Sequence, residues 1–161
     1  MKLPKWNRLK TNYPVVEAGR VFKRIGGKVE LNYRIGVFRN ACATRVSKAL
    51  NGAGVGHQIP YIKELGASGK LESQVSSGKY NKWYIFRVKV LVKYLKSKYG
   101  NPEQLKYLNY KKLLQGRKGI IVFKVSGWSD ATGHADLWDG KRCLWKDYGG
   151  QANKILFWES Q

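Results

Sequence analysis

The stretch from Gly119 to the C-terminus most constrains the fold, because it consists of short apolar runs separated by turn residues. Runs that predict strands lie at residues 120–125, 133–138, 141–145 and 154–158. Asp139-Gly140, between the second and third runs, is a strong signal for a tight hairpin turn. The sequence therefore predicts an antiparallel sheet in the C-terminal part of the chain.

Segments before Gly119 carry helix signals instead. They are residues 42–50 after the capping residue Asn40, an amphipathic stretch at 83–99, and a segment that starts at Asn101-Pro102 and ends near Gly116. Val46 and Leu50 follow Cys42 at helical spacing, which predicts that this face of the first helix packs on the sheet. Helices followed by an antiparallel sheet are typical of an α+β fold.

Three other segments carry weaker signals. Residues 1–12 are basic and polar and predict a tethered N-terminal arm. Residues 29–38 alternate apolar and polar side chains over several positions, which predicts a strand or an extended approach to the next helix. Residues 56–80 are rich in turn residues and predict a long loop, either one that flanks a substrate groove or a solvated excursion. At this length, residues 1–161 are expected to form a single domain.

The balance of charged residues predicts an anionic partner. Thirty-one Lys and Arg residues against ten Asp and Glu residues give a formal charge of +21, and the basic residues are spread along the chain. Nucleic acid, an anionic membrane surface and an anionic cell-wall polymer all fit such a charge. The apolar content of 43% and the aromatic content of 13% exclude an intrinsically disordered chain.

Cysteine usage and hydropathy set further bounds. Cys42 and Cys143 are too few for a disulfide framework, and no C-x-x-C pair or His/Cys cluster has zinc spacing, so we expect neither a metal nor another cofactor. No apolar run has signal-peptide length or reaches the roughly twenty residues that span a bilayer. The sequence predicts a chain without a transmembrane segment, made in the cytoplasm, that leaves the cell, if at all, by a route other than general secretion.

Cys42 is a candidate nucleophile because of its place at the start of a predicted helix. Asn40 can cap this helix, which leaves Cys42 in the first turn. The unpaired N-H groups of a first turn carry partial positive charge and favour a thiolate over a thiol. The alternative is an unreactive cysteine buried on a core helix.

His134 is the candidate base, and two carboxylates are candidates to orient it. Asp136 lies two residues further along the predicted strand and so faces the same side of the sheet. Across the predicted hairpin turn, Trp145 falls opposite His134, and Asp147 lies one same-face step beyond. Taken alone, His134 can equally be a histidine satisfied by local hydrogen bonds. The other histidine, His57, lies in a Gly-rich loop and has no acid placed by a regular element, which makes it the weaker candidate base.

A thiol at a helix N-terminus, an imidazole on a packed strand and a carboxylate behind it are the parts of a cysteine acyl-transfer site. The imidazole of His134 would take the Cys42 proton, the thiolate would attack a carbonyl, and His134 would then protonate the leaving amine. Backbone N-H groups near Cys42 would help to hold the oxyanion. The pattern therefore predicts a cysteine amidase or peptidase.

Two motifs occur in a fixed order along the chain. They are Asn40-Ala-Cys-Ala-Thr-Arg-Val-Ser-Lys-Ala-Leu-Asn51 and Ser129-Asp-Ala-Thr-Gly-His-Ala-Asp-Leu-Trp-Asp-Gly140, followed by an apolar ending at Phe157-Trp158. In these motifs the chain resembles the fourth family of type VI secretion amidase effectors, which are papain-like peptidoglycan hydrolases of the NlpC kind. The resemblance extends from Tyr13 to Trp158, and residues 56–118 carry little of it.

The resemblance implies an activity and its setting. Such enzymes are injected into the periplasm of a rival Gram-negative cell, where they cut the peptidoglycan stem peptide between D-glutamate and meso-diaminopimelate. The nucleophile of the family falls on Cys42 and its base on His134. The implied partners are the stem-peptide substrate and a cognate immunity protein that protects the producing cell by blocking the site. The free enzyme is expected to be a monomer.

The chain departs from the family pattern after the hairpin. Family members carry an Asp there that is flanked by two cysteines, whereas this chain has Cys143, no second cysteine, and Trp145 where the Asp would fall. We therefore expect the third catalytic residue to be Asp147, reached if a bulge or a longer turn shifts the strand, in preference to Asp136. Cys143 is expected to be a free thiol or a core residue.

Two other functions fit parts of the sequence. A basic nucleic-acid-binding module would use the positive charge and the many aromatic residues as a stacking groove, but no helix-turn-helix, zinc or RNA-recognition signature supports specific binding to nucleic acid. A cysteine deamidase or protease acting on a protein would share the amidase fold and differ in its groove loops. Peptidoglycan hydrolysis is the function that the two ordered motifs favour.

Overall fold

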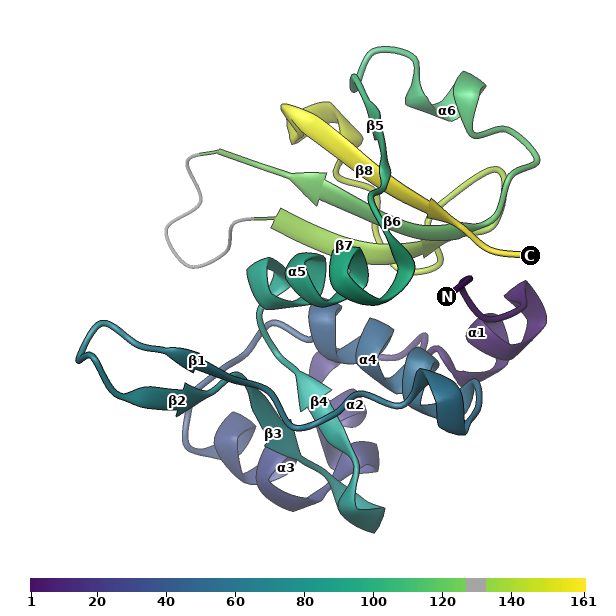
Figure 1. Cartoon of the computed structure of the whole chain (residues 1–161). Coiled ribbons are helices and arrows are strands. Elements are labelled where there is room, and N and C mark those ends of the chain that lie inside the picture. The colour runs from purple at the N-terminus through teal and green to yellow at the C-terminus, as the bar shows by residue number, and fades with distance from the viewer. Residues whose placement is uncertain (127–132) are drawn as a thin grey trace.

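The structure is a computed structural model that describes residues 1–126 and 133–161, and it has the α+β architecture that the sequence predicts (Figure 1). The larger sheet of the described residues is antiparallel, and its strands follow the order β5 (Glu103–Leu105), β8 (Lys154–Glu159), β6 (Gly119–Lys124) and β7 (Gly133–Trp138). The strands predicted at 120–125, 133–138 and 154–158 are thus confirmed. Residues 129–132, which belong to the second quoted motif, lie outside the described residues.

The edge strand β7 divides its side chains between two surroundings. Ala135 and Leu137 belong to the main hydrophobic core. His134 and Asp136 alternate with them, and they pair in register with Phe123 and Ile121 of β6, so they occupy the other side of the strand. Because β7 is an edge strand, no further strand covers its outer side. A neighbouring helix or loop can therefore contact side chains on both faces of β7.

The helices α4 (Cys42–Gly52) and α5 (Val88–Tyr99) cover the face of the sheet on which Ala135 and Leu137 lie (Figure 1). Val46 and Leu50 are fully buried, as their helical spacing from Cys42 predicts. This packing places the first turn of α4 next to β7.

The helix predicted at 83–99 begins later than expected. Residues Trp83–Ile85 form the strand β4, and only Val88–Tyr99 is helical. The backbone N-H of Ile85 donates to the Ser47 hydroxyl at 3.0 Å, which holds this segment extended along α4. The apolar pattern is correct for burial, but tertiary hydrogen bonds decide where the helix starts.

The predicted N-terminal arm is wrong. Residues Trp6–Asn12 form the helix α1, and Leu9 is fully buried in the main core together with Trp6. These two residues and Tyr13 recur at spacings of three and four, so they make one apolar stripe along the helix. The basic residues lie on its other faces, and their number concealed the stripe in the sequence.

Residues 29–38, predicted as a strand or an extended approach to the next helix, form no strand: residues 29–34 are helical, and only residues 35–38 lack regular structure. The helices α2 (Ala18–Ile25) and α3 (Gly27–Arg34) meet at Gly26, whose φ of +66° is accessible to glycine and strained for other residues. Val21, Phe22 and Ile25 of α2 pack with Val29 of α3 in a separate small core. The alternation of apolar residues does not match a buried face here, since Leu31 and Ile35 are exposed.

Residues 56–80, predicted as a long loop, contain three short strands. The strand β1 (Lys63–Leu65) pairs with β2 (Leu71–Ser73), and β3 (Val75–Ser77) pairs with β4. Short 3-10 turns occur at Val55–His57, Lys79–Asn81 and Gly149–Gln151. The β1–β2 hairpin projects away from the body of the molecule (Figure 1).

The helix predicted from Asn101-Pro102 to Gly116 is wrong for most of its length. Residues Glu103–Leu105 pair with β8 as an edge strand, and only Tyr110–Leu113 forms a helix, α6. Leu105 lies opposite Ile155 and is buried, so strand pairing overrides the local helix-start signal. Among the described residues, no helix is long and apolar enough to cross a membrane.

The hairpin turn at Asp139-Gly140 is present, but the strand predicted at 141–145 is not. Asp139 accepts hydrogen bonds from the N-H groups of Lys141 and Arg142, and Gly140 has a φ of +100°. Beyond the turn, this segment contributes a single bridge between Trp138 and Cys143. The chain then leaves the sheet, because the next backbone N-H groups bond to a side chain of β7.

Candidate active site

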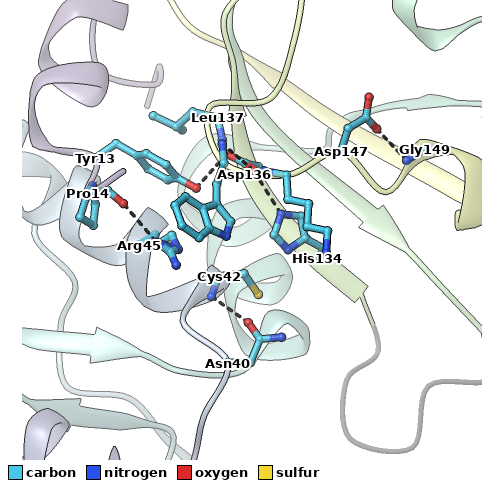
Figure 2. Close-up of polar contacts among 12 residues, drawn as sticks. Tyr13, Pro14, Asn40, Cys42, Arg45, His134, Asp136, Leu137, Asp147 and Gly149 are labelled. Atoms are coloured by element: carbon cyan, nitrogen blue, oxygen red, sulfur yellow. Dashed lines mark hydrogen bonds and ion pairs between the residues drawn. The ribbon is translucent and has the colours of Figure 1, made fainter. Parts of the chain in front are cut away.

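Cys42 is the first residue of α4 and is almost fully buried. Ala41 occupies the N-cap position, and the Asn40 side chain accepts a hydrogen bond from the Cys42 N-H at 3.0 Å (Figure 2). Asn40 thus binds the first turn, as expected, although it sits one residue before the cap. The sulfur lies in the positive field of the helix N-terminus.

His134 lies on β7 with a carboxylate beside it. Its Nε2 atom is 3.2 Å from Oδ2 of Asp136, and both side chains are buried. The Tyr148 ring lies against the imidazole, with ring centroids 4.6 Å apart. The spacing of two residues along a strand therefore brings the imidazole and the carboxylate together, as predicted.

The structure also brings His134 to Cys42. Burial lowers the pKa of the His134 imidazole, but the hydrogen bond to Asp136, the charge of Asp136 and the interaction with Cys42 raise the pKa by more, to about 9. Figure 2 shows Cys42 next to the His134 ring, with Asp136 on its opposite side. The imidazole is therefore held between a thiol and a carboxylate.

Asp136 is fully buried, and donors surround both of its oxygens. The donors other than His134 are the hydroxyl of Tyr13 at 2.8 Å and the backbone N-H groups of Leu137 at 2.7 Å, Trp145 at 3.2 Å and Lys146 at 2.8 Å. A buried carboxylate needs such partners, because an unpaired buried charge is very costly. These hydrogen bonds explain why the chain leaves the sheet after Cys143: the backbone N-H groups of Trp145 and Lys146 bind the Asp136 carboxylate and not a neighbouring strand.

Asp147, expected to be the third catalytic residue, does not lie beside His134 in the structure; Asp136 does. Asp147 accepts hydrogen bonds from the Tyr110 hydroxyl at 2.6 Å and the Gly149 N-H at 2.8 Å, and it forms an ion pair with Lys111 at 3.1 Å. Burial raises the pKa of Asp147, but these three partners lower it more. Figure 2 shows Asp147 directed away from His134. The turn is longer than two residues, since Trp138 pairs with Cys143, but the loop that follows wraps Asp136 and leaves Asp147 beside Tyr110.

His57 is not part of this cluster. It lies beyond the C-terminal end of α4, an 11-residue helix that is about 16 Å long and begins at Cys42. Its Nδ1 atom is 3.1 Å from the Tyr99 hydroxyl. Burial and the charges of Lys98 and Arg8 lower the pKa of His57.

Cys143 is buried and unbonded to Cys42. Burial and the charges of Asp136 and Asp147 raise the pKa of its thiol. It packs with Trp138 in the second hydrophobic core, on the α6 side of the sheet. In the part of the chain that the structure describes, no group of three or more His, Cys, Asp or Glu side chains is arranged to hold a metal ion.

Two residues near the site, Tyr13 and Arg45, were not predicted from the sequence. Tyr13 donates to Asp136 across 123 positions of the sequence. Arg45 places its guanidinium 3.9 Å from the centre of the Trp145 ring. No local pattern links these residues to the motifs, because they meet only through the packing of α1 and α4 on β7.

Comparisons with known proteins identify the group to which these features correspond. Residues 38–158 match the family model described as type VI secretion system (T6SS), amidase effector protein 4, or Tae4. The comparison with curated proteins gave no match.

Solved structures of Tae4 proteins are similar over the whole chain. The Tae4–Tai4 effector–immunity complex from Salmonella Typhimurium has a TM-score of 0.82 and 31% identity, and the match covers 99% of this chain and 100% of that chain. The corresponding complex from Enterobacter cloacae has a TM-score of 0.81 and 28% identity, with 99% of each chain covered. Tae4 from Enterobacter cloacae has a TM-score of 0.78 and 31% identity, with 100% of each chain covered.

Proposed function

Because the chain belongs to the amidase effector 4 family of type VI secretion systems, we propose that it hydrolyses the stem peptide of peptidoglycan through Cys42, His134 and Asp136. Membership of the family makes the chain an amidase toxin that targets peptidoglycan. The proposal adds the catalytic residues and the bond, which is the amide between D-glutamate and meso-diaminopimelate. The resemblance in the two motifs supports this choice of bond.

The proposal rests on one arrangement: the His134 imidazole lies between the Cys42 thiol and the Asp136 carboxylate (Figure 2). His134 Nε2 lies 3.2 Å from Asp136 Oδ2, and Cys42 lies next to the same ring (Figure 2). Because Asp136 occupies Nε2, Nδ1 is the ring nitrogen that remains for the thiol. A base held between its nucleophile and an orienting carboxylate is the arrangement of a cysteine acyl-transfer enzyme.

The proposed reaction has two steps. The Cys42 proton passes to His134, and the thiolate attacks the carbonyl carbon of the amide while the N-terminus of α4 stabilises the developing oxyanion. The C–N bond then breaks, the leaving amine takes the proton from His134, and a thioester remains on Cys42. Water, deprotonated by His134, attacks the thioester; this releases the carboxylic acid and returns the proton to the thiol.

The surroundings of His134 suit this chemistry. A pKa of about 9 favours the protonated imidazole at neutral pH. Asp136 holds the ring in one orientation and stabilises the imidazolium that forms. The raised pKa therefore favours transfer of the Cys42 proton to His134, which later delivers it to the leaving amine.

We place this chemistry in the setting of the family. The protein is delivered by type VI secretion into the periplasm of a rival bacterium and acts there as a monomer. Two of the three Tae4 structures described above are complexes with the immunity protein Tai4, and a cognate immunity protein is the proposed partner that blocks Cys42 and His134. The charge of +21 favours adhesion to the anionic polymers of the target cell envelope.

Digestion of purified sacculi tests the function. The protein is incubated with Gram-negative sacculi, and the released fragments are separated and identified by mass spectrometry. We expect stem peptides cut after D-glutamate with a free amine on meso-diaminopimelate, and no such product from Cys42→Ala. Cys143→Ala is the matched control, because its thiol lies outside the proposed triad, and it should release the same products as the wild type.

Two outcomes would contradict the proposal. Intact stem peptides after incubation with the wild-type protein would exclude wall hydrolysis at this bond. Equal cleavage by Cys42→Ala would exclude the proposed nucleophile. Salt-sensitive binding of DNA or RNA, together with intact sacculi, would instead favour the nucleic-acid-binding function.

A further inference from the structure

We propose that Tyr13 is a positioning residue of the active site, because its hydroxyl fixes the Asp136 carboxylate that orients His134. Arg45 secures Tyr13 by tying the following residues to the nucleophile helix. The inference rests on the proposed function, since it assigns a role within the same triad. It adds a residue that lies far from both motifs in the sequence.

Tyr13 is placed to select one orientation of the carboxylate. It follows α1, is 5% exposed, and donates to Oδ1 of Asp136 at 2.8 Å (Figure 2). The N-H of Leu137 donates to the same oxygen at 2.7 Å. Together these donors engage Oδ1, so Oδ2 is the oxygen that faces His134. Rotation of the carboxylate would break both bonds to Oδ1.

The Tyr13 hydroxyl remains a donor at all working pH values. Burial raises the pKa of Tyr13 well above its ordinary value, and the charge and hydrogen bond of Asp136 raise it further. The phenol therefore stays neutral and keeps its proton directed at the carboxylate.

Arg45 connects Tyr13 to the helix that carries Cys42. It lies one turn after Cys42 on α4, and its Nη1 atom donates to the carbonyl oxygens of Pro14 at 3.2 Å and Val16 at 2.5 Å. The same guanidinium stacks on the Trp145 ring, and the backbone N-H of Trp145 donates to Asp136. One buried side chain thus holds the segment after α1 and the loop after β7 against α4. Both segments carry donors to the carboxylate.

The effect of Tyr13 on pH dependence follows from the charged groups around the carboxylate. Five titratable or charged groups lie near Asp136: Tyr13 from the segment after α1, Cys42 and Arg45 from α4, His134 from β7, and Cys143 from the loop after β7. Tyr148 lies against the ring of His134. Removal of the phenol donor leaves one carboxylate lone pair unshared, which strengthens the attraction of Asp136 for the imidazolium. The pKa of His134 should therefore rise in Tyr13→Phe.

The test compares Tyr13→Phe with Tyr94→Phe. Tyr94 is also buried, but its hydroxyl is 3.5 Å from the Gln58 carbonyl oxygen and outside the site. The measurements are kcat and KM on a soluble muropeptide across pH, and titration of His134 by NMR. For Tyr13→Phe we expect kcat to fall by about tenfold, with KM little changed. A positioned acid–base group contributes roughly a hundredfold or more, and loss of Tyr13 should remove only part of that effect. The basic limb of the kcat profile and the His134 titration should both move to higher pH, and Tyr94→Phe should match the wild type.

A second variant keeps the test decisive if Tyr13→Phe fails to fold. Arg45→Lys retains the positive charge but cannot hold two carbonyl groups and stack on Trp145 at the same time, so we expect a smaller loss of kcat and the same upward shift. Unchanged kcat and an unchanged His134 titration in the folded variants would overturn the role of Tyr13. An inactive wild type would overturn the proposed function instead, and the His134 titration would still report on the positioning of the carboxylate.

Discussion

At the scale of single residues, Asp136 and Asp147 provide the sharpest comparison. Asp136 is fully buried beside His134, whereas Asp147 is bound by Tyr110, Gly149 and Lys111. Asp136→Asn keeps the size of the side chain but removes the charge that stabilises the imidazolium. We expect it to lower kcat/KM on muropeptides by about a hundredfold to ten-thousandfold.

Asp147→Asn is the matched control for that variant. It should keep kcat/KM within about twofold of the wild type and lose on the order of 1 kcal/mol of stability with its hydrogen bonds. If the two variants exchanged these effects, the assignment of the third catalytic residue to Asp136 would be wrong.

The raised pKa of His134 also predicts how stability depends on pH. The folded value is about 9 and the ordinary value is 6.5, so between these values the folded protein binds more protons than the unfolded chain. This contribution is fully present below about pH 6.5 and is lost as the pH rises through about 9. We expect the free energy of unfolding, measured with urea, to fall over this range by on the order of 1–3 kcal/mol more in the wild type than in His134→Gln. Parallel curves for the two proteins would contradict the raised pKa.

Local patterns were sufficient to predict part of the site. Cys42 follows a capping residue, and His134 and Asp136 are two residues apart on one strand. Short-range sequence patterns are therefore enough to predict each of them as a candidate site residue. The choice between Asp136 and Asp147 depends on the path of the chain after Trp138, which no local signal specifies. Tyr13 is beyond such rules altogether, because its partner lies 123 positions away.

At the scale of elements, α1 gives a direct test of the fold. Leu9 is fully buried on the apolar stripe of this helix, whereas Lys10, the next residue, is exposed. We expect Leu9→Ala to reduce the free energy of unfolding by about 2–4 kcal/mol and Lys10→Ala to change it by less than about 0.5 kcal/mol. Chemical denaturation measures both. Equal, small effects would mean that residues 1–12 are a loosely attached arm after all.

The strands of the sheet were easier to predict than the segments around them. The strands β6 and β8 are mostly buried, and their sequences are correspondingly continuous apolar runs. Such runs can be recognised in the sequence without knowledge of the neighbouring segments. Residues 101–116 carry a helix-start signal, yet pairing with β8 gains more than a local helix. Residues 6–12 and 27–34 are short helices whose packing residues are few, so their patterns are weak in the sequence.

At the scale of the whole molecule, the charge of +21 should act on binding and leave the chemistry unchanged. We expect attachment of Cys42→Ala to sacculi, measured by co-sedimentation, to weaken steeply as salt is raised, because salt screens the attraction between exposed charges. Hydrolysis of a small soluble muropeptide by the wild type should change little over the same range. Salt-independent attachment would assign wall binding to specific contacts instead of net charge.

The proposed catalysis requires that the Cys42 thiol and the His134 imidazole act as one pair, and site-resolved alkylation measures this. The folded protein is treated briefly with iodoacetamide at neutral pH, and mass spectrometry measures the labelling of Cys42, with Cys143 as the internal reference in the same chain. If the two groups act as a pair, Cys42 is labelled faster than Cys143 in the wild type, and His134→Gln, shown to be folded by circular dichroism, loses most of this excess. Equal labelling of the two cysteines, or labelling of Cys42 that does not depend on His134, would contradict this pairing.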